Sequence, residues 1–439
     1  MQSLVVTIFP SIARLNAFLV AMLVLSFIYF RVSSKNYVPN LVALLIVFNA
    51  MNPISYLQKP LLGIPGFQPA HLAWLLTFVV VLNSRVKSGE PLGFSIFVST
   101  PFLIYMIVNL IAFVRTFTAG PDHSFYLSGF TRSDLFFGYF LNPVQILLTG
   151  WMVMLNSKNP EDMRVVQRGI LISSIAFSVI LTVAYLWKGA LAGGHSGFSL
   201  GRAMLGEVSG LHPNTLGGLS FYYFVASSTL KMHRAKVLSV VAIGMSLLGV
   251  LFTLSRMAWY ATVFVGILSF IKATWRMRII VILAAFMVYW QFHTLIINRI
   301  HHGTEQQVVS EMDKIDNITA GRLSGAWIPA LRQIAQNPVF GTGSMTMVVV
   351  EWYGGGSAHN AYLKVLLDTG IIGAIVVAAM MVNFWRRARK KKGAFYYAMI
   401  GMCAMGFVGH SFFPRKSNYL FWLLYGIDLN ESQENIDGK

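Results

Sequence analysis

The chain has 439 residues, of which 56% are hydrophobic and 11% are charged, and its mean hydropathy is +0.62. This composition excludes an ordinary water-soluble enzyme, in which about a quarter of the residues are charged. The formal net charge of +18 does not indicate nucleic-acid binding, because the basic residues lie in short loops between apolar runs. The sequence therefore predicts an all-α, polytopic integral membrane protein.

Apolar runs long enough to cross the hydrocarbon core, which takes roughly 20 residues, recur along almost the whole chain. We expect about twelve transmembrane helices, at residues 12–30, 37–51, 69–82, 92–114, 134–155, 169–187, 214–230, 237–255, 257–271, 279–297, 361–385 and 394–413. The apolar piece at 419–429 is too short to span alone and is expected only to dip into the membrane interface.

Basic residues fall on every second loop: Arg31 and Lys35; Arg85 and Lys87; Lys158, Arg164 and Arg168; Lys231, Arg234 and Lys236; Lys272, Arg276 and Arg278; and the run RRARKKK at 386–392. This alternation is the positive-inside signature and predicts that those loops face the cytoplasm. The intervening loops, including all the long ones, and both ends of the chain are then expected outside. We expect no cleavable signal peptide, and the single cysteine, Cys403, allows no intramolecular disulfide.

Two of the outward segments are long and polar, and neither is large enough to fold alone. We therefore expect a transmembrane bundle over 1–297 that includes an outward loop at 188–213, a large outward loop over 298–360, and C-terminal transmembrane helices with a tail over 361–439. Within the large loop, LSGAWIPALRQIAQNP places apolar residues at helical spacing. It predicts a short amphipathic helix on the membrane surface that stops at Pro338.

Three basic side chains stand where these segments meet the spans. Arg256, in TLSRMAWYA, interrupts two adjoining spans without an acidic neighbour in sequence, and phosphate is the ligand that suits a guanidinium there best. Arg322 precedes the predicted amphipathic helix. His359 follows the flexible stretch GGGSA and opens a span, which is a suitable place for a reactive imidazole. The structural alternatives are a snorkelling Arg, a solvated loop charge and a capping His.

The outward loop at 188–213 and the end of the large loop supply further candidates. Arg202, His212 and Asn214 lie in GRAMLGEVSGLHPN, where they are expected to help bind substrate, although His212 also has a simple structural reading at the entry to a span. Asn360 follows His359 and is assigned the same binding role. Asp368 is either a functional acid or one half of an ion pair with a neighbouring span.

Other patterns point to structure or are absent. Gly370 and Gly373, in GIIGAI, are expected to allow close helix packing. The sequence contains no Walker A loop and no Cys or His cluster for zinc, so no metal and no cofactor are expected.

The stretches TLSRMAWYA, AGRLSGAWIPALRQIAQNPVFGTGS and SAHNAYLKVLLDTGIIGAIV, in this order and spacing, resemble the bacterial O-antigen ligase and O-antigen polymerase superfamily. The resemblance covers roughly the last half of the chain, and the first half agrees mainly in hydropathy. It implies a membrane-embedded, GT-C-like glycosyltransferase of the bacterial inner membrane, with its site facing the periplasm and its donor glycan carried on undecaprenyl diphosphate. It also implies that His359, Arg256 and Arg322 are functional.

The chemistry of these residues suits that reaction. Guanidinium groups stabilise the charge that develops on a departing diphosphate. An imidazole near its pKa takes a proton from an attacking hydroxyl. We therefore expect Arg256 and Arg322 to act on the donor and His359 on the acceptor.

The acceptor separates the alternatives. A ligase transfers the glycan to lipid A core, whereas an O-antigen, capsule or exopolysaccharide polymerase transfers it to the next lipid-linked repeat unit. SAHN and the single large loop before it favour the ligase, and a protein acceptor is a third reading. A lipid-linked oligosaccharide flippase or other transporter should carry charged or polar residues along several spans and internal symmetry between its halves. These spans are nearly free of charge, Asp368 apart, and the polar residues concentrate in the outward loops, which suits a surface site better than a conduit. The expected partners are these lipid-linked substrates and membrane lipids, without nucleic acid; the sequence predicts no oligomeric state.

Overall fold

A computed structural model of the chain describes residues 24–28, 36–51, 67–118, 132–157, 159–186, 213–230, 236–272, 275–301, 322–344, 358–407 and 412–437. This part of the chain is helical and contains no strand. Five of its helices are long and apolar enough to cross a membrane, at Pro69–Ser88, Thr100–Thr118, Phe137–Leu155, Pro160–Leu186 and Ala361–Lys391. The all-helical class is confirmed, while the number of about twelve spans stays a prediction.

Helices occur at the expected spans within the described residues. The chain divides into two compact units, one of residues 1–58 with 159–302 and the other of residues 59–158 with 303–439. Unit 1 contains α3 (Tyr37–Met51), α10 (Pro160–Leu186), α12 (Pro213–Thr229), α13 (Lys236–Phe252), α14 (Arg256–Lys272) and α15 (Trp275–His301). Both units are assembled from stretches far apart in sequence.

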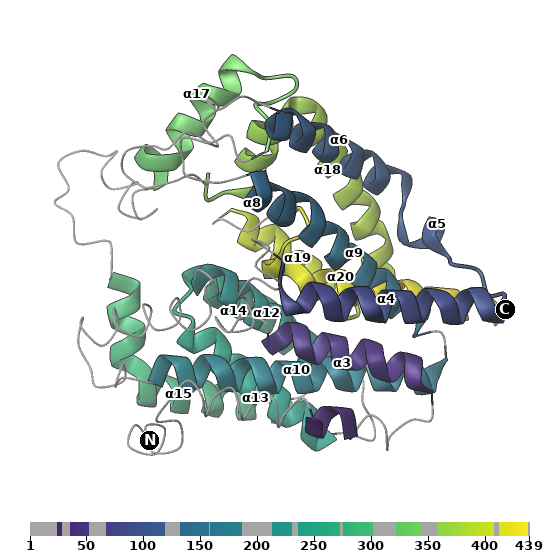
Figure 1. Cartoon of the computed structure of the whole chain (residues 1–439). Helices are drawn as coiled ribbons and strands as arrows, with labels where there is room; N and C mark the ends of the chain where they lie inside the picture. Colours follow the sequence, from purple (N-terminus) through teal and green to yellow (C-terminus); the bar gives the residue numbers. More distant parts are fainter. Residues whose placement is uncertain are drawn as a thin grey trace, which may run out of the picture. The chain divides into compact units, whose positions relative to one another are not determined.

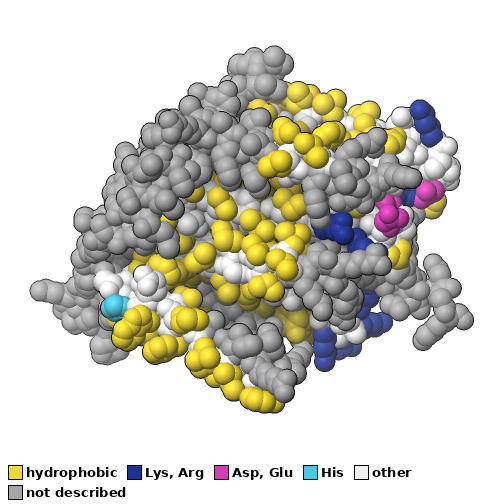
Figure 2. Space-filling model, turned by 90° about the horizontal axis from the view of Figure 1, so that it is seen from below, with side chains coloured by type: hydrophobic (Ala, Val, Ile, Leu, Met, Phe, Trp, Pro, Cys, Tyr) yellow, Lys and Arg dark blue, Asp and Glu magenta, His cyan; other side chains and the backbone are white. Residues whose placement is uncertain are grey.

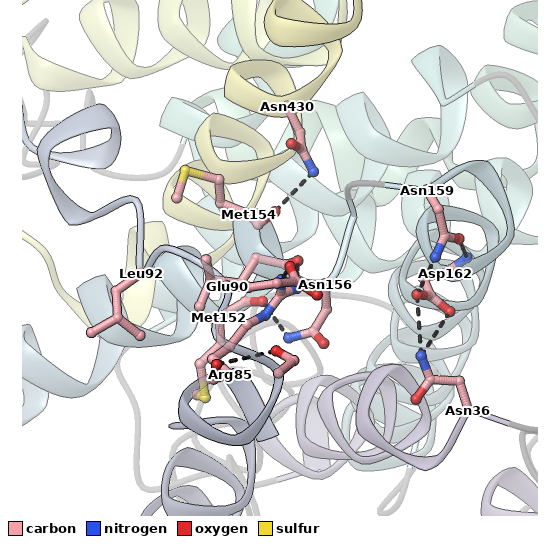
Figure 3. Close-up of polar contacts among 12 residues, drawn as sticks. Asn36, Arg85, Glu90, Leu92, Met152, Met154, Asn156, Asn159, Asp162 and Asn430 are labelled. Atoms are coloured by element: carbon pink, nitrogen blue, oxygen red, sulfur yellow. Dashed lines mark hydrogen bonds and ion pairs between the residues drawn. The ribbon is translucent and has the colours of Figure 1, made fainter. Parts of the chain in front are cut away.

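Small residues allow the helices of unit 1 to pack closely. A Cβ on Gly169 of α10 would lie 2.9 Å from the Cβ of Ala43, so α3 and α10 run side by side (Figure 1). The hydroxyls of Ser174 and Ser246 bond at 2.6 Å and join α10 to α13. At the start of α10, Asp162 accepts a hydrogen bond from Asn36 ahead of α3 (Figure 3).

The outer surfaces of α13, α14 and α15 are apolar. Large hydrophobic side chains are exposed there, including Val237, Val240, Val263, Ile267, Ile282, Phe286 and Trp290. Hydrophobic side chains also make up most of the described surface in Figure 2. A soluble protein rarely exposes such a surface, whereas lipid covers it at no cost.

Unit 2 contains α4 (Pro69–Ser88), α5 (Phe94–Phe97), α6 (Thr100–Thr118), α8 (Arg132–Phe136), α9 (Asn142–Leu155), α17 (Ile328–Gln336), α18 (Ala361–Lys391), α19 (Ala394–Gly406) and α20 (Tyr419–Asp437). Short π-helical turns lie at Phe137–Leu141 and Leu323–Trp327, and a 3-10 turn lies at Lys416–Asn418. The expected short helix before Pro338 is thus confirmed; its position on the membrane surface stays a prediction.

Helix α20 lies at the centre of unit 2. Phe421, Trp422 and Tyr425 are fully buried, and their rings contact Phe384 of α18. A Cβ on Gly150 of α9 would overlap the backbone of α20, so these two helices approach closely.

Polar contacts gather several helix ends at one end of unit 2. Arg85, near the end of α4, pairs with Glu90 and donates to the carbonyl of Leu155 at the end of α9 (Figure 3). Lys391, the last residue of α18, donates to the carbonyl of Asp428 at 2.8 Å. The basic residues of α4 and α18 therefore share one end of the unit, called here the basic end.

Helix α20 contains the short apolar piece at 419–429 and ends beside the basic residues of unit 2. It begins near the end of α19, yet Asp428 and the residues that follow it lie at the basic end, where the amide of Asn430 donates to the carbonyl of Met154 at 2.8 Å (Figure 3). The piece at 419–429 therefore belongs to α20, a helix buried within unit 2, and the C-terminal end of that helix lies with the basic loops. Its expected position in the membrane interface stays a prediction.

Candidate functional site

The long helix α18 is broken one third of the way along. Gly370 has φ 67° and ψ −164°, which interrupts the helical hydrogen bonding on both sides. The freed groups are bonded by residues 337–344, the NPVFGTGS loop. Its Thr342 and Gly343 donate their N–H groups to the carbonyls of Leu367 and Asp368 at 2.7 and 3.1 Å. A discontinuous helix whose backbone is satisfied by a loop is typical of membrane proteins that build a site in the membrane.

Two glycines make this contact possible. Gly341 in the loop and Gly370 in the helix both have φ near +65°, where a side chain is strained. A Cβ on Gly370 would overlap the carbonyl of Val339, and one on Gly341 would overlap the backbone at Asp368. The close approach expected at Gly370 is therefore real, but its partner is a loop rather than another helix.

Helix α6 holds the other side of the loop. Arg115 donates to the carbonyls of Phe340 and Gly341 at 3.1 and 3.3 Å. Thr116 donates its hydroxyl to the carbonyl of Ser344 at 2.9 Å. The loop is thus fixed between α6 and α18 at the end of unit 2 opposite the basic end.

His359 lies at that same end, just before α18. Its backbone φ is +46°, and it precedes Asn360, whose side-chain oxygen accepts from the N–H groups of Tyr362 and Leu363 at 3.0 and 3.1 Å. Asn360 is therefore the N-cap of α18, and its expected role in substrate binding stays a prediction. The half-buried His359 stands outside the helix on a constrained backbone rather than in the first helical turn.

Arg322 belongs to an element that packs beside His359. Ala326 and Ala330, on the π-helical turn and α17, form one apolar cluster with Ala358 and Leu367. Arg322 lies one turn before Ala326, and Ala358 is the residue before His359. The structure therefore brings the neighbourhoods of these two candidate residues together within unit 2.

Arg256 and Asn214 come together in unit 1. A Cβ on Gly217 of α12 would overlap the side chain of Ser255, the residue before α14, so the first turns of the two helices pack against each other. Trp259 bonds the carbonyl of Val250 at 2.9 Å and closes the turn between α13 and α14. Arg256 and Asn214 therefore lie at the same end of neighbouring helices. Arg202 and His212 lie outside the described residues.

A small polar cavity lies under the first turns of α18, and sequence analysis did not anticipate it. Its volume is about 20 Å³, and it is lined by side chains of α6, the π-helical turn before α9, α18 and the segment between α19 and α20. The polar residues around it are Tyr105, Asn109, Tyr139, Ser344, Lys364, Asp368, Thr369 and Arg415. Asp368 pairs with Lys364 of its own helix at 2.7 Å, so its ion-pair partner is not on a neighbouring span.

Arg415 is the residue that sequence reasoning missed. Its guanidinium lies over the ring of Tyr139, 4.6 Å from the ring centre, and its buried Nε and Nη2 atoms have no hydrogen-bond partner. The available signal was FPRKSN, a basic pair between two apolar stretches without an acidic neighbour. The same signal drew attention to Arg256.

The next residue, Lys416, enters a separate polar cluster. Its ammonium donates to the side chain of Gln68 at 3.1 Å, ahead of α4. His71 accepts from the backbone N–H of Gln68 at 2.8 Å, and its other ring nitrogen bonds Asn142 at 2.9 Å. Burial lowers the pKa of Lys416 to about 8.

Within the described residues, no three His, Cys, Asp or Glu side chains are grouped to hold a metal ion. Residues 240–378 match a family model described as O-antigen ligase. The match includes Arg256, Arg322 and His359, together with the NPVFGTGS loop and the break at Gly370, and ends before Arg415. A comparison with curated proteins found no match.

Proposed function

We propose that this protein is an O-antigen ligase-type glycosyltransferase, because residues 240–378 match a family model described as O-antigen ligase and five helices are long and apolar enough to cross a membrane. It transfers a glycan from undecaprenyl diphosphate to a hydroxyl of lipid A core, at the periplasmic face of the bacterial inner membrane. The observation that carries the proposal is the packing of α17 beside Ala358, which brings the elements of Arg322 and His359 together at the end of unit 2 away from its basic loops.

Each residue has a defined part in this reaction. His359 accepts or orients the proton of the attacking hydroxyl, which contributes typically 10²- to 10⁴-fold to such a step. Arg322 and Arg256 stabilise the negative charge that the diphosphate gains as the sugar C1–oxygen bond breaks. Asn214, Asn360, Arg202 and His212 are the proposed substrate-binding groups. With no covalent nucleophile assigned beside His359, the reaction is a single inverting displacement.

The alternative within the same superfamily is a polymerase that joins lipid-linked repeat units. It uses the same donor chemistry and differs only in the acceptor. The SAHN sequence and the large loop before it favour the ligase, as argued above.

A complementation experiment tests the function and His359 together. Wild type and His359→Ala are produced at matched levels in a host that lacks its own ligase, and surface glycan is followed by gel. We expect the wild type to restore the ladder on lipid A core and His359→Ala to lower it by at least about 10²-fold, with carrier-linked polymer accumulating. His293→Ala, an exposed histidine of α15, is the control and should restore the ladder fully.

The glycan pattern of the His359→Ala strain distinguishes a ligase from a polymerase. A His359→Ala strain with shortened polymer on the carrier lipid would establish the polymerase. An unaltered ladder would remove His359 from the mechanism.

Arg322 is tested against an arginine of the same helical segment. We expect Arg322→Gln to reduce transfer by about 10²-fold, because a positioned charge at the leaving group is lost. Arg332→Gln removes an exposed charge of α17 and should leave transfer unchanged. Equal losses in both variants would mean that net charge, rather than the position of Arg322, matters.

A further inference from the structure

The cavity under α18 contains a buried cation whose hydrogen bonds are incomplete. Two N–H-bearing atoms of Arg415, Nε and Nη2, are buried without a partner. An arginine is charged at any working pH, and a buried charge is costly unless an anion or further hydrogen bonds meet it. The stacking of Arg415 on Tyr139 offsets only part of this cost.

The charges that line the cavity do not cancel. Arg415 and Lys364 are positive, and Asp368 is the one acid. Asp368 pairs with Lys364 at 2.7 Å and also attracts Arg415 electrostatically, so the two cations share one carboxylate and one positive charge is left over. The cavity is therefore complementary to one negative charge.

The hydroxyl groups that line the cavity and the volume of the cavity further restrict which ligand it can bind. Tyr105, Tyr139 and Ser344 add hydroxyls, which can donate to an anionic oxygen. About 20 Å³ holds an oxygen-sized group but not a whole diphosphate. A phosphoryl group bound here inserts its terminal oxygens and leaves the rest of the molecule outside.

We propose that Arg415, supported by Lys364, forms an oxyanion subsite at the first turns of α18 that binds a phosphoryl group of a substrate. This inference rests on the proposed function for the identity of the substrate, and it assigns that function a binding residue beyond the region of the family match. The phosphoryl group comes from one of two sources, the diphosphate of the lipid-linked donor or a phosphate on the acceptor.

Inorganic pyrophosphate is the first probe, because its binding requires no glycan transfer. It is titrated into the purified, full-length protein in lipid nanodiscs, and the thermal unfolding midpoint reports binding. We expect pyrophosphate to raise the midpoint of the wild type and Arg415→Gln to weaken its apparent affinity roughly 10- to 100-fold, since charge-assisted hydrogen bonds are lost. Asp368→Asn, which removes the negative charge of the cavity, should strengthen binding.

Lys416→Gln is the matched control. It removes the same charge one residue along, from a side chain that faces Gln68 instead of the cavity, and should leave pyrophosphate binding close to wild type. If Arg415→Gln does not fold, Arg415→Lys keeps the charge, loses the planar fork and should still bind more weakly. Wild-type pyrophosphate binding by either folded Arg415 variant would overturn the subsite and leave Arg415 a structural residue.

Transfer kinetics then distinguish the source. A raised KM for the lipid-linked donor in Arg415→Gln assigns the subsite to the donor diphosphate, and a raised KM for the acceptor assigns it to an acceptor phosphate. If the wild type restores no glycan ladder in the complementation experiment while Arg415→Gln loses pyrophosphate binding, the proposed function falls and the anion site stands. If transfer requires His359 while both KM values and pyrophosphate binding are unchanged in Arg415→Gln, the function stands and the subsite falls.

Discussion

Arg415 and Arg256 occupy comparable positions. Each follows an apolar helix, precedes or begins another, and has no acidic neighbour in sequence. The lack of an acidic neighbour drew attention to Arg256, and the structure shows that Arg415 meets the physical criterion more fully, because its Nε and Nη2 atoms are buried without a hydrogen-bond partner. A residue outside a family motif is thus recognised by what surrounds it rather than by its pattern.

The buried ammonium group of Lys416 gives a second prediction about a single residue. Its pKa is lowered to about 8 by burial, against about 10.4 for an ordinary lysine. Between these two values the unfolded chain binds more protons than the folded protein, so raising the pH through this window stabilises the fold; below about pH 8 the cost of the buried charge is fully present. We expect the thermal unfolding midpoint of the wild type to gain more between about pH 7.5 and about pH 9.5 than that of Lys416→Met. Parallel pH profiles for the two proteins would contradict the lowered pKa.

At the scale of elements, the broken helix α18 organises the candidate site. The backbone groups freed at the break are hydrogen-bonded to the NPVFGTGS loop, and Arg115 of α6 holds this loop in place. The part of α18 before the break begins at its N-cap, Asn360, which follows His359. A shift of the loop would therefore move the first turns of α18, on which Lys364 and Asp368 lie. The NPVFGTGS loop therefore positions the first turns of α18 rather than supplying a reacting group.

This role makes Gly370 sensitive to any side chain. We expect Gly370→Ala to destabilise the protein by at least about 2–3 kcal/mol, because the positive φ is strained and the Cβ overlaps the loop backbone. Gly244→Ala in α13 is the control, since a Cβ there meets nothing within 4 Å and alanine is the better helix former. The measurement is thermal unfolding in detergent; equal midpoints for the two variants would show that the docking of the loop contributes little.

At the scale of the whole molecule, the two ends of unit 2 differ in the residues they carry. Several arginines and lysines lie together at the ends of α4 and α18, whereas His359 and the NPVFGTGS loop lie at the other end with single basic side chains such as Arg115. The positive-inside rule then predicts that the basic end faces the cytoplasm, an orientation that labelling can test.

Two single-cysteine variants make that test, both in a Cys403→Ser background. A maleimide that does not cross the inner membrane should label Arg332→Cys, exposed on α17, in intact cells. It should label Lys390→Cys, exposed near the end of α18, only after the membrane is permeabilised. Labelling of both positions in intact cells would refute the proposed orientation of unit 2.

The sequence by itself determined the helical class, most helix positions and the resemblance to a family whose model matches residues 240–378, because lipid imposes long apolar helices and because TLSRMAWYA and SAHN are local patterns. It also located Arg256, Arg322 and His359, but not what surrounds them. The course of α20, the break at Gly370 and the cavity of Arg415 depend on contacts between residues as far apart as Ala112 and Ser344, or Tyr139 and Arg415. Only the tertiary structure decided these features. Hydropathy does not distinguish a helix surrounded by protein from one surrounded by lipid, and a buried charge is recognised as unpaired only from the groups that pack around it.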